Sequence, residues 1–463
     1  MGLSIGLDTA VTGLRAAQLA IDTTAHNVAN ANTEGYSRQE VLFRAIPPAR
    51  SRWRNPGVPL QDIGLGVDAS RIRRLRDALL DVQYRDVRRG YDQYQAEAAA
   101  LRRAETALSE PSDLGLQQHL VQFFNTFRDL AAHPESIAAR AATIEQGVTL
   151  STAFQRTYAL LAAQRTDLDA AVDVKVQEIN EKAQEVAALN QQIQLVTLAG
   201  GTPNDLLDRR DLLLDDLAGL AGVTVQDGPS GAVDVLIGGR KLVDGVTANT
   251  LAAVPDPGNN NFKKVVWAAD NADAGITAGE VAGIIRARDV HVTGLMTALD
   301  TLAGALIAAV NARHQSGYGL NGATGLNFFT GSGAADIAVN PTLQGSPESL
   351  AASDAPGEPG NPNTARAIAA VQDALLMNGG TATLDDYYRA MVASLGVSTK
   401  QAEAQMNGQE AVLKHIDAER QSVMGVSVDE EMSNLIKFQR AYQAAARVIR
   451  TVDEMLDTLI NRT

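Results

Sequence analysis

Hydrophobic side chains repeat at alternating steps of four and three residues near both ends of the chain. This spacing predicts amphipathic helices with a coiled-coil seam. The N-terminal seam consists of Leu7, Val11, Leu14, Gln18, Ile21, Ala25 and Val28. The C-terminal seam consists of Val428, Met432, Leu435, Gln439, Tyr442, Ala446, Ile449, Asp453, Leu456 and Ile460. Neither stripe has a matching stripe nearby in sequence, so we expect the two ends to meet in a helical bundle.

The interior of the chain also follows the helical repeat. Seams run through residues 87–108, 172–197 and 395–423. The helical stretch from about residue 135 to residue 198 would reach roughly 90 Å at about 1.5 Å per residue if it is unbroken. A shorter helix is expected over residues 205–220, after Pro203. Helices of this length predict a rod-shaped molecule.

Two regions depart from the helical pattern. Residues 40–72 hold Pro47, Pro48, Pro56 and Pro59 between short apolar runs, which indicates loop and strand. Residues 223–285 alternate apolar and polar side chains around turn sequences and predict strands, one of them near 263–267. The tract 345–363, rich in Gly, Pro, Ser and Asn, is typical of a loop.

The predicted fold class is therefore mainly α, with long coiled-coil-like helices from both termini forming a rod and a small β-rich inserted domain. We assign a terminal helical assembly domain to residues 1–40 plus 425–463. A helical body domain with some strand is assigned to residues 41–222 plus 286–424. The β-rich inserted domain is assigned to residues 223–285.

Composition and charge argue against several classes of function. The formal net charge of −14 disfavours a nucleic-acid binder. The absence of cysteine excludes disulfides, thiolate metal sites and cysteine nucleophiles. The N-terminus lacks the basic and continuous apolar regions of a Sec signal, and the longest apolar stretch, near 299–310, is too short to span a bilayer. An extracellular role would therefore need another export route.

Catalytic and metal-binding patterns are missing from the sequence. The histidines stand singly and no pair has HxxxH spacing, which argues against a zinc site. We find no phosphate-binding loop, nucleophile elbow or dinucleotide fingerprint, and we predict no catalytic, cofactor-binding or metal site and no enzyme. The histidines are His26, His119, His133, His291, His314 and His415.

Arginines gather between positions 38 and 89, where lysine is absent. Arginine without lysine is typical of fixed protein interfaces, because its planar guanidinium pairs with carboxylates in a defined geometry. The net charge argues against nucleic acid as the partner. These arginines are Arg38, Arg44, Arg50, Arg52, Arg54, Arg71, Arg73, Arg74, Arg76, Arg85, Arg88 and Arg89.

A polar segment follows the first predicted helix. By local chemistry alone it is a helix end and a sharp turn, since Asn and Gly tolerate the left-handed backbone conformation. Taken whole, the segment resembles the signature of the flagellar axial proteins, a family of rod, hook and hook-associated subunits. Its continuation, residues 37–39, is similar to the hook-associated members. The motif residues are Asn27, Asn30, Asn32, Thr33, Gly35, Tyr36, Ser37, Arg38 and Gln39.

The resemblance extends over most of the chain in the expected order. Residues 425–444 are similar to the closing helix of the family, and Ser427 with Glu430 also fits a capping box. Residues 204–211, 279–280, 308–314 and 325–329 resemble family segments on either side of the β insert. The insert itself is shorter than in the larger family members.

The resemblance implies an exported structural subunit of the bacterial flagellum at the junction between hook and filament. Assembly would then proceed by coiled-coil pairing of the N- and C-terminal helices. Export would use the flagellar type III apparatus without a cleaved signal, and the location would be extracellular. The implied partners are other copies of the chain in a helical ring, the hook protein, a second junction protein and a cytoplasmic export chaperone, with no nucleic acid and no membrane.

Three alternatives stay open at this point. A hook protein would share both terminal motifs but lack Ser-Arg-Gln after Gly-Tyr. An extracellular coiled-coil adhesin would explain the helices and the acidity but would not require matched terminal motifs. A hydrolase in the β insert would need an active site that no motif indicates.

Overall fold

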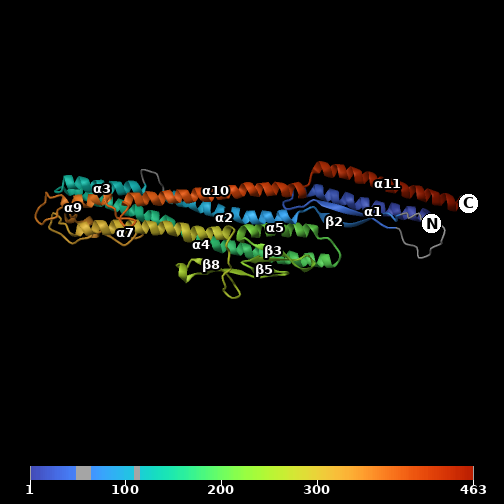
Figure 1. Cartoon of the computed structure of the whole chain (residues 1–463), viewed down its shortest axis with the longest axis horizontal. Helices are drawn as coiled ribbons and strands as arrows, with labels where there is room; N and C mark the ends of the chain where they lie inside the picture. The colour runs from blue at the N-terminus through green and yellow to red at the C-terminus, as the bar shows by residue number, and fades with distance from the viewer. Residues whose placement is uncertain (1, 48–63, 109–114, 462–463) are drawn as a thin grey trace.

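The computed structural model describes residues 2–47, 64–108 and 115–461, with side chains described over 6–458 of these ranges. Long helices run along the axis of an elongated molecule, and the N- and C-terminal ends lie together at one end (Figure 1). A small region of strands lies against the middle of the rod. The mainly α fold with a central β-rich part, predicted from the sequence, is confirmed.

Helix α4, Ile137–Leu198, is the spine of the body and is 62 residues long. It begins where the Ser136 hydroxyl accepts a hydrogen bond from the amide of Ala139, a typical N-cap. Val172, Val176 and Ile179 are buried at steps of four and three, as the repeat predicts. At about 1.5 Å per residue the helix is about 93 Å long and runs along the body, and the terminal helices extend the rod beyond its end (Figure 1).

The other body helices pack along this spine and along each other. They are α2 (Ala78–Leu108), α3 (Leu116–Ala132), α5 (Asn204–Ala221), α6 (Glu280–Arg286), α7 (Thr293–Gln315), α8 (Pro341–Gly345), α9 (Asn363–Ala369) and α10 (Leu384–Met424). Helix α10 pairs with α2, and α3 and α7 pack on α4. Helices α6 and α7 are joined by the π-helical segment Ala287–Val292. The expected loop 345–363 holds one short 3-10 turn, Pro347–Ser349, and lies at the end of the rod opposite the termini.

The expectation that the longest apolar stretch is too short to span a bilayer is wrong by length and composition: among the described residues, the helical segment Glu280–Gln315 is long and apolar enough to cross a membrane. Half of its most apolar window is buried inside the body. Leu299, Leu306 and Val310 belong to the hydrophobic core. Burial in the core accounts for its apolar character.

Strands of the inserted region form two antiparallel sheets. The first has the order β3–β4–β5–β6, with β3 Thr224–Asp227, β4 Val233–Ile237, β5 Arg240–Asp244 and β6 Thr247–Ala248. The second pairs β7, Leu251–Pro255, with β8, Lys263–Trp267, which is the strand expected near 263–267. Asn190 of α4 holds the insert: its side chain donates to the carbonyls of Val233 and Gly245 and accepts from the amide of Val233. A two-stranded ribbon of β9 (Phe329–Thr330) and β10 (Ala338–Val339) lies elsewhere, in the body.

The terminal region consists of α1 (Gly2–Ala29), α11 (Val428–Asn461) and a ribbon of β1 (Gln39–Ala45) paired with β2 (Val67–Arg74). Helices α1 and α11 run antiparallel side by side, and the ribbon packs against α1 (Figure 1). The loop and strand expected over 40–72 correspond to this ribbon. Pro48, Pro56 and Pro59 lie outside the described residues.

Candidate functional site

A buried polar joint lies where α1 ends and α11 begins, and Asn27 is at its centre. The Asn27 amide nitrogen donates to the Gln39 carbonyl and to Oε2 of Glu431, both at 2.9 Å. Its amide oxygen accepts from the Tyr36 hydroxyl at 2.8 Å and from the Gln39 amide at 2.9 Å. Asn27 is 1% exposed, and all four hydrogen-bonding positions of its side chain are used.

The motif also ends α1, as the sequence predicts. The Asn30 side chain donates to the His26 carbonyl at the end of the helix, and Thr33 donates to the Asn30 side chain. Gly35 has φ +77°, a conformation that L side chains rarely adopt. Asn32 is exposed, with no hydrogen bond to any residue that the structure describes.

Ser37 and Gln39 connect the motif to α5. The Ser37 hydroxyl and amide both donate to the Asp208 carboxylate, at 2.7 and 3.0 Å. The Gln39 side chain donates to Asp205 and accepts from Asn204. Ser37 is fully buried, so the motif is fixed directly to the body of the rod.

Arg38 connects the motif to α11 and to the end of α10. Its guanidinium lies 2.9 Å from the Glu430 carboxylate and 2.7 Å from the Glu431 carboxylate. Its amide donates to the Met424 carbonyl at 2.8 Å. The expected capping box is only half present: the Glu430 amide approaches the Ser427 hydroxyl at 3.5 Å, but the Glu430 carboxylate binds Arg38 instead of the cap. A hydrogen bond from the charged Arg38 guanidinium is stronger than one from the neutral backbone amide of Ser427, so the Glu430 carboxylate binds Arg38.

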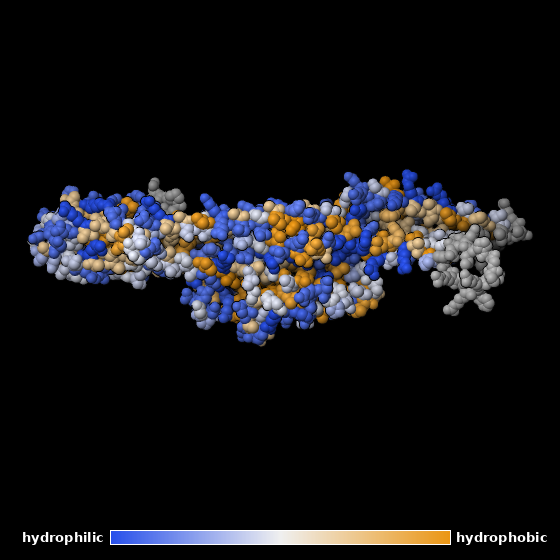
Figure 2. Space-filling model, in the orientation of Figure 1, coloured by the Kyte–Doolittle hydropathy of each residue, from blue (hydrophilic) through white to orange (hydrophobic). Residues whose placement is uncertain are grey.

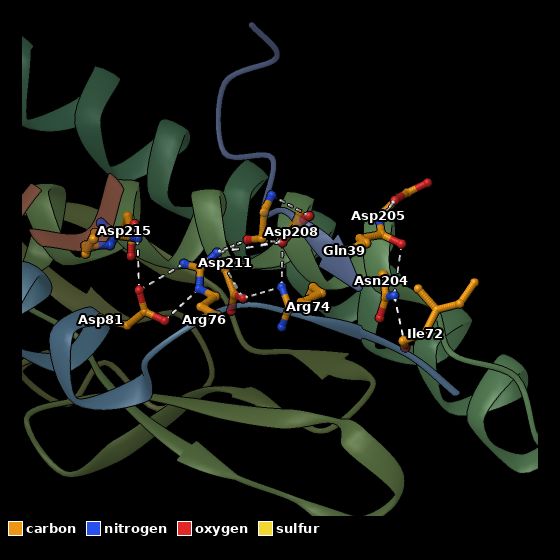
Figure 3. A network of polar contacts seen from close by, with 12 residues as sticks. Gln39, Ile72, Arg74, Arg76, Asp81, Asn204, Asp205, Asp208, Asp211 and Asp215 are labelled. Carbon is orange, nitrogen blue, oxygen red and sulfur yellow. Dashed lines mark hydrogen bonds and ion pairs between the residues drawn. The ribbon is translucent and has the colours of Figure 1, made fainter. Parts of the chain in front are cut away.

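Arginines of β2 and α2 continue the polar joint along α5 (Figure 3). Arg74 contacts Asp208 and Asp211 at 2.7 and 2.9 Å. Further along, Arg85 contacts Asp215 at 2.6 Å. Further contacts of this row join Arg76 to Asp81, Asp208 and Asp211, Arg85 to Asp211, Arg88 to Asp92 and Asp216, and Arg420 of α10 to Asp81 and Asp215.

The sequence pointed to carboxylate partners for the arginines and left those partners unidentified. The structure shows that many are aspartates of the same chain, whereas Arg50, Arg52 and Arg54 lie outside the described residues. The spacing of polar residues in α5 could have identified these partners from the sequence. Asn204, Asp208, Asp211 and Asp215 follow one another at steps of four, three and four. That spacing places them on one face of a helix.

Burial and the neighbouring arginines shift the pKa values of the α5 aspartates in opposite directions. Burial alone would raise the pKa of Asp211, but Arg76, Arg74 and Arg85 outweigh it and hold that pKa below its usual value. At Asp208 burial prevails over Arg74 and the Ser37 hydrogen bonds, and its pKa is raised. Asp211 is therefore the carboxylate whose ionised form the joint stabilises most clearly.

The predicted seam residues are not the buried face of the terminal helices within one subunit. On α1, Leu7, Val11, Leu14, Ile21 and Val28 are half-buried, whereas the other two seam residues, Gln18 and Ala25, are exposed. On α11, Leu435, Ala446, Ile449 and Leu456 are half-buried, whereas Val428, Met432 and Tyr442 are exposed. The side chain of Ile460 lies outside those that the structure describes.

Small side chains form the buried face of α1 instead. Ala10, Ala17, Ala20, Thr24 and Asn27 are buried, each one position before a seam residue. One position is about 100° around a helix, so the seam lies beside the buried face and is partly open. Figure 2 shows apolar residues reaching the surface along α11. Use of the seam between subunits stays a prediction.

Family profiles match the chain at three places. The profile described as the flagellar hook-associated protein FlgK helical domain matches residues 101–329. A flagella basal body rod protein profile matches residues 7–36, and the C-terminal profile of the flagellar basal body rod FlgEFG protein matches residues 420–462. The two rod-protein profiles thus fall on α1 with its motif and on α11, the elements that meet in the joint.

Relatives with a curated name cover nearly the whole chain. Flagellar hook-associated protein 1 of Bacillus subtilis is 30% identical, over 99% of this chain and 98% of that protein. The protein of the same name from Escherichia coli is 27% identical, over 98% of this chain and 99% of that protein. The solved structure of the flagellar hook junction protein FlgK from Burkholderia pseudomallei matches with a TM-score of 0.65 at 15% identity. It covers 74% of this chain and 100% of that chain, and at this identity it shows the fold alone.

Proposed function

Because the chain belongs to the flagellar hook-associated protein 1 family, we propose that it is the subunit that joins the hook of the bacterial flagellum to the filament. The chain is a structural component of the flagellum and not an enzyme. The junction role, the partners and the route of export are the steps that we add. They follow from the family resemblance and from the polar joint.

The polar joint is the observation that carries the proposal. Three stretches of sequence that resemble axial proteins, residues 27–39, 204–211 and 425–444, converge there. Their contacts are buried and largely satisfied, so they fix the terminal helix pair against the body at a defined angle. A subunit that binds the hook lattice on one side and a different lattice on the other needs a fixed angle between its terminal helix pair and its body.

We propose that α1 and α11 build the inner part of the assembly and that their seams contact neighbouring copies. The proposed domains are the terminal assembly domain 1–40 plus 425–463, the body 41–222 plus 286–424, and the insert 223–285. On α11 only Glu431 and Val452 are buried among the described side chains. A helix so exposed is marginal in water by itself, which favours completion by neighbours.

We propose the hook protein as the partner below, a second junction protein above, and a cytoplasmic chaperone before export by the flagellar type III apparatus. Contacts with the hook and with the upper layer are heterologous, because each joins two different surfaces. The hook protein itself is the second candidate within the wider family. The sequence Ser37-Arg38-Gln39 favours the junction role, because the hook protein would lack Ser-Arg-Gln after Gly-Tyr.

Deletion of the gene tests the proposal. We expect hooks of ordinary length without attached filaments, loss of motility, and flagellin released into the medium. A plasmid copy of the wild-type gene should restore filaments, which controls for effects on neighbouring genes. Electron micrographs that show basal bodies without hooks would point to the hook protein, and normal filaments would refute both roles.

A further inference from the structure

An arginine-lined cavity of about 810 Å³ opens between β2, the start of α2, the end of α4 and the first strands of the insert. Its acidic lining residues are Asp81, Asp211 and Asp227. Its basic lining residues are Arg71, Arg73, Arg74, Arg76, Arg85 and Arg210. The cavity is therefore a positive site in a chain whose net charge is −14, and such a site attracts anionic groups.

Arg210 shows that the positive charge of the cavity is not fully neutralised by the chain itself. Arg210 is 6% exposed, and its guanidinium donates to the Asn190 side chain and to the Gly231 carbonyl. Among the described residues no carboxylate lies within ion-pair distance of Arg210, and its Nε has no hydrogen-bond partner. Burial lowers the pKa of Arg210 and prevails over the more distant negative charges of Asp211 and Asp227.

Arg71 brings a second unneutralised charge to the same cavity. It lies on β2, it is exposed, and it forms no ion pair with any residue that the structure describes. Val82 of α2, 62% exposed, adds an apolar contact at the edge. Arginines without carboxylate partners are suited to fixed pairing with the carboxylates of another protein, because the planar guanidinium binds carboxylates in a defined geometry.

We propose that this cavity binds carboxylate side chains presented by a second copy of this chain in the assembled flagellum. The inference rests on the proposed function, because it needs copies packed beside each other. Each copy carries 54 acidic against 40 basic residues, so a neighbour offers carboxylates wherever it approaches. In a repeating assembly the same heterologous contact then recurs from copy to copy. Among the described residues that line the cavity none is aromatic, whereas base stacking with a nucleic acid would require aromatic side chains.

Photo-crosslinking in assembled flagella identifies the molecule that lies at the cavity. Val82 is replaced by p-benzoylphenylalanine in the full-length chain, and flagella are isolated from cells that remain motile. After irradiation we expect a covalent dimer of this chain, and mass spectrometry should locate the attachment in a segment rich in Asp or Glu. Only intramolecular products, attachment to a different flagellar protein, or attachment far from any acidic residue would overturn the proposal. In motile cells any of these outcomes leaves the junction role standing.

Charge variants test the mechanism of attraction. In the Val82-labelled chain, Arg71→Glu should lower the dimer yield about tenfold through like-charge repulsion, whereas Arg71→Lys should keep most of it. The matched control is Arg103→Glu, an equal charge change at an exposed position of α2 outside the cavity, which should leave the yield unchanged. Circular dichroism of the purified variants checks that the helices are intact. An unchanged dimer yield in Arg71→Glu would refute recruitment by charge.

Discussion

Asn27 and Glu431 lie 404 positions apart in the sequence, yet the amide of the first donates to the carboxylate of the second at 2.9 Å. Both residues are at most 2% exposed. A buried carboxylate is tolerated when it has hydrogen bonds and a positive partner, and here Asn27 and Arg38 supply them. The contact therefore ties the start of α11 to the end of α1 through groups that water cannot replace.

Removal of the Asn27 amide should weaken this contact. Asn27→Ala removes one of the two side-chain partners of Glu431 and the Asn27 bonds to the Tyr36 hydroxyl and to backbone groups of Gln39, and we expect a loss of about 2–4 kcal/mol in the free energy of opening α1 and α11. Hydrogen exchange of their amides measures it. Asn32→Ala, in the same motif at an exposed position, is the control and should change this energy by no more than about 0.5 kcal/mol. Equal effects of the two variants would contradict the role of Asn27.

Gly35 should be sensitive to a single added methyl group. At φ +77° an alanine costs about 1–2 kcal/mol, and its Cβ would lie 3.4 Å from the Leu212 side chain. Gly13→Ala is the opposite case, because that position lies within α1 and an added Cβ meets no atom within 4 Å. There we expect a gain of up to about 1 kcal/mol in helix stability. Urea unfolding followed by circular dichroism should show the two variants shifting in opposite directions.

Acid should weaken the joint through Asp211. Its pKa is lowered in the folded protein, so the stabilisation is fully present above the ordinary value of about 3.9 and is lost as the pH falls through the lowered value. Asp211→Asn should cost on the order of 2–4 kcal/mol at pH 7 and should lessen the loss of stability as the pH falls below about 4. Urea unfolding across this range measures both. Asp373→Asn, at a side chain 81% exposed, should follow the wild-type profile.

A charge on the seam should block assembly while the body stays folded. Leu14→Asp and Ile449→Asp place a carboxylate at half-buried positions that neighbours are expected to cover, at a cost of several kcal/mol once covered. We expect secretion to persist and incorporation into flagella to fail. Ala444→Asp, at an exposed position two residues from Tyr442 and so on another face of α11, is the control. Normal flagella in cells with Ile449→Asp would refute the seam.

Long-range periodicity made the helices predictable. The stretch expected from about residue 135 to 198 is α4, and the helix expected over 205–220 is α5, Asn204–Ala221. These segments repeat one apolar spacing over many turns, and Pro203 marks the boundary between them. The turn after α1 was also predictable, because Asn30 and Gly35 have local reasons to end a helix.

The buried face of α1 and the partners of the arginines could not be predicted in the same way. A search for large apolar side chains selects Leu14 and Ile21, whereas the face that packs within the subunit consists of residues such as Ala17 and Ala20. Small side chains carry little hydrophobic signal and become informative only when a neighbouring backbone is known to approach closely. The choice of Asp208 as the partner of Ser37 depends on how α5 lies against the ribbon, which is tertiary information.

The joint also imposes an order of events on a chain that emerges from a ribosome or a channel N-terminus first. Asn27 and Arg38 emerge early, but their shared partner Glu431 emerges only after the whole body of the chain and the first turn of α11 have followed. Until then the motif at residues 27–39 lacks the Glu431 carboxylate, and α1 and α11 are not joined through the polar joint. Emergence of the start of α11 is thus the event that allows this contact to form, so the two terminal helices cannot be joined through it before the body has passed.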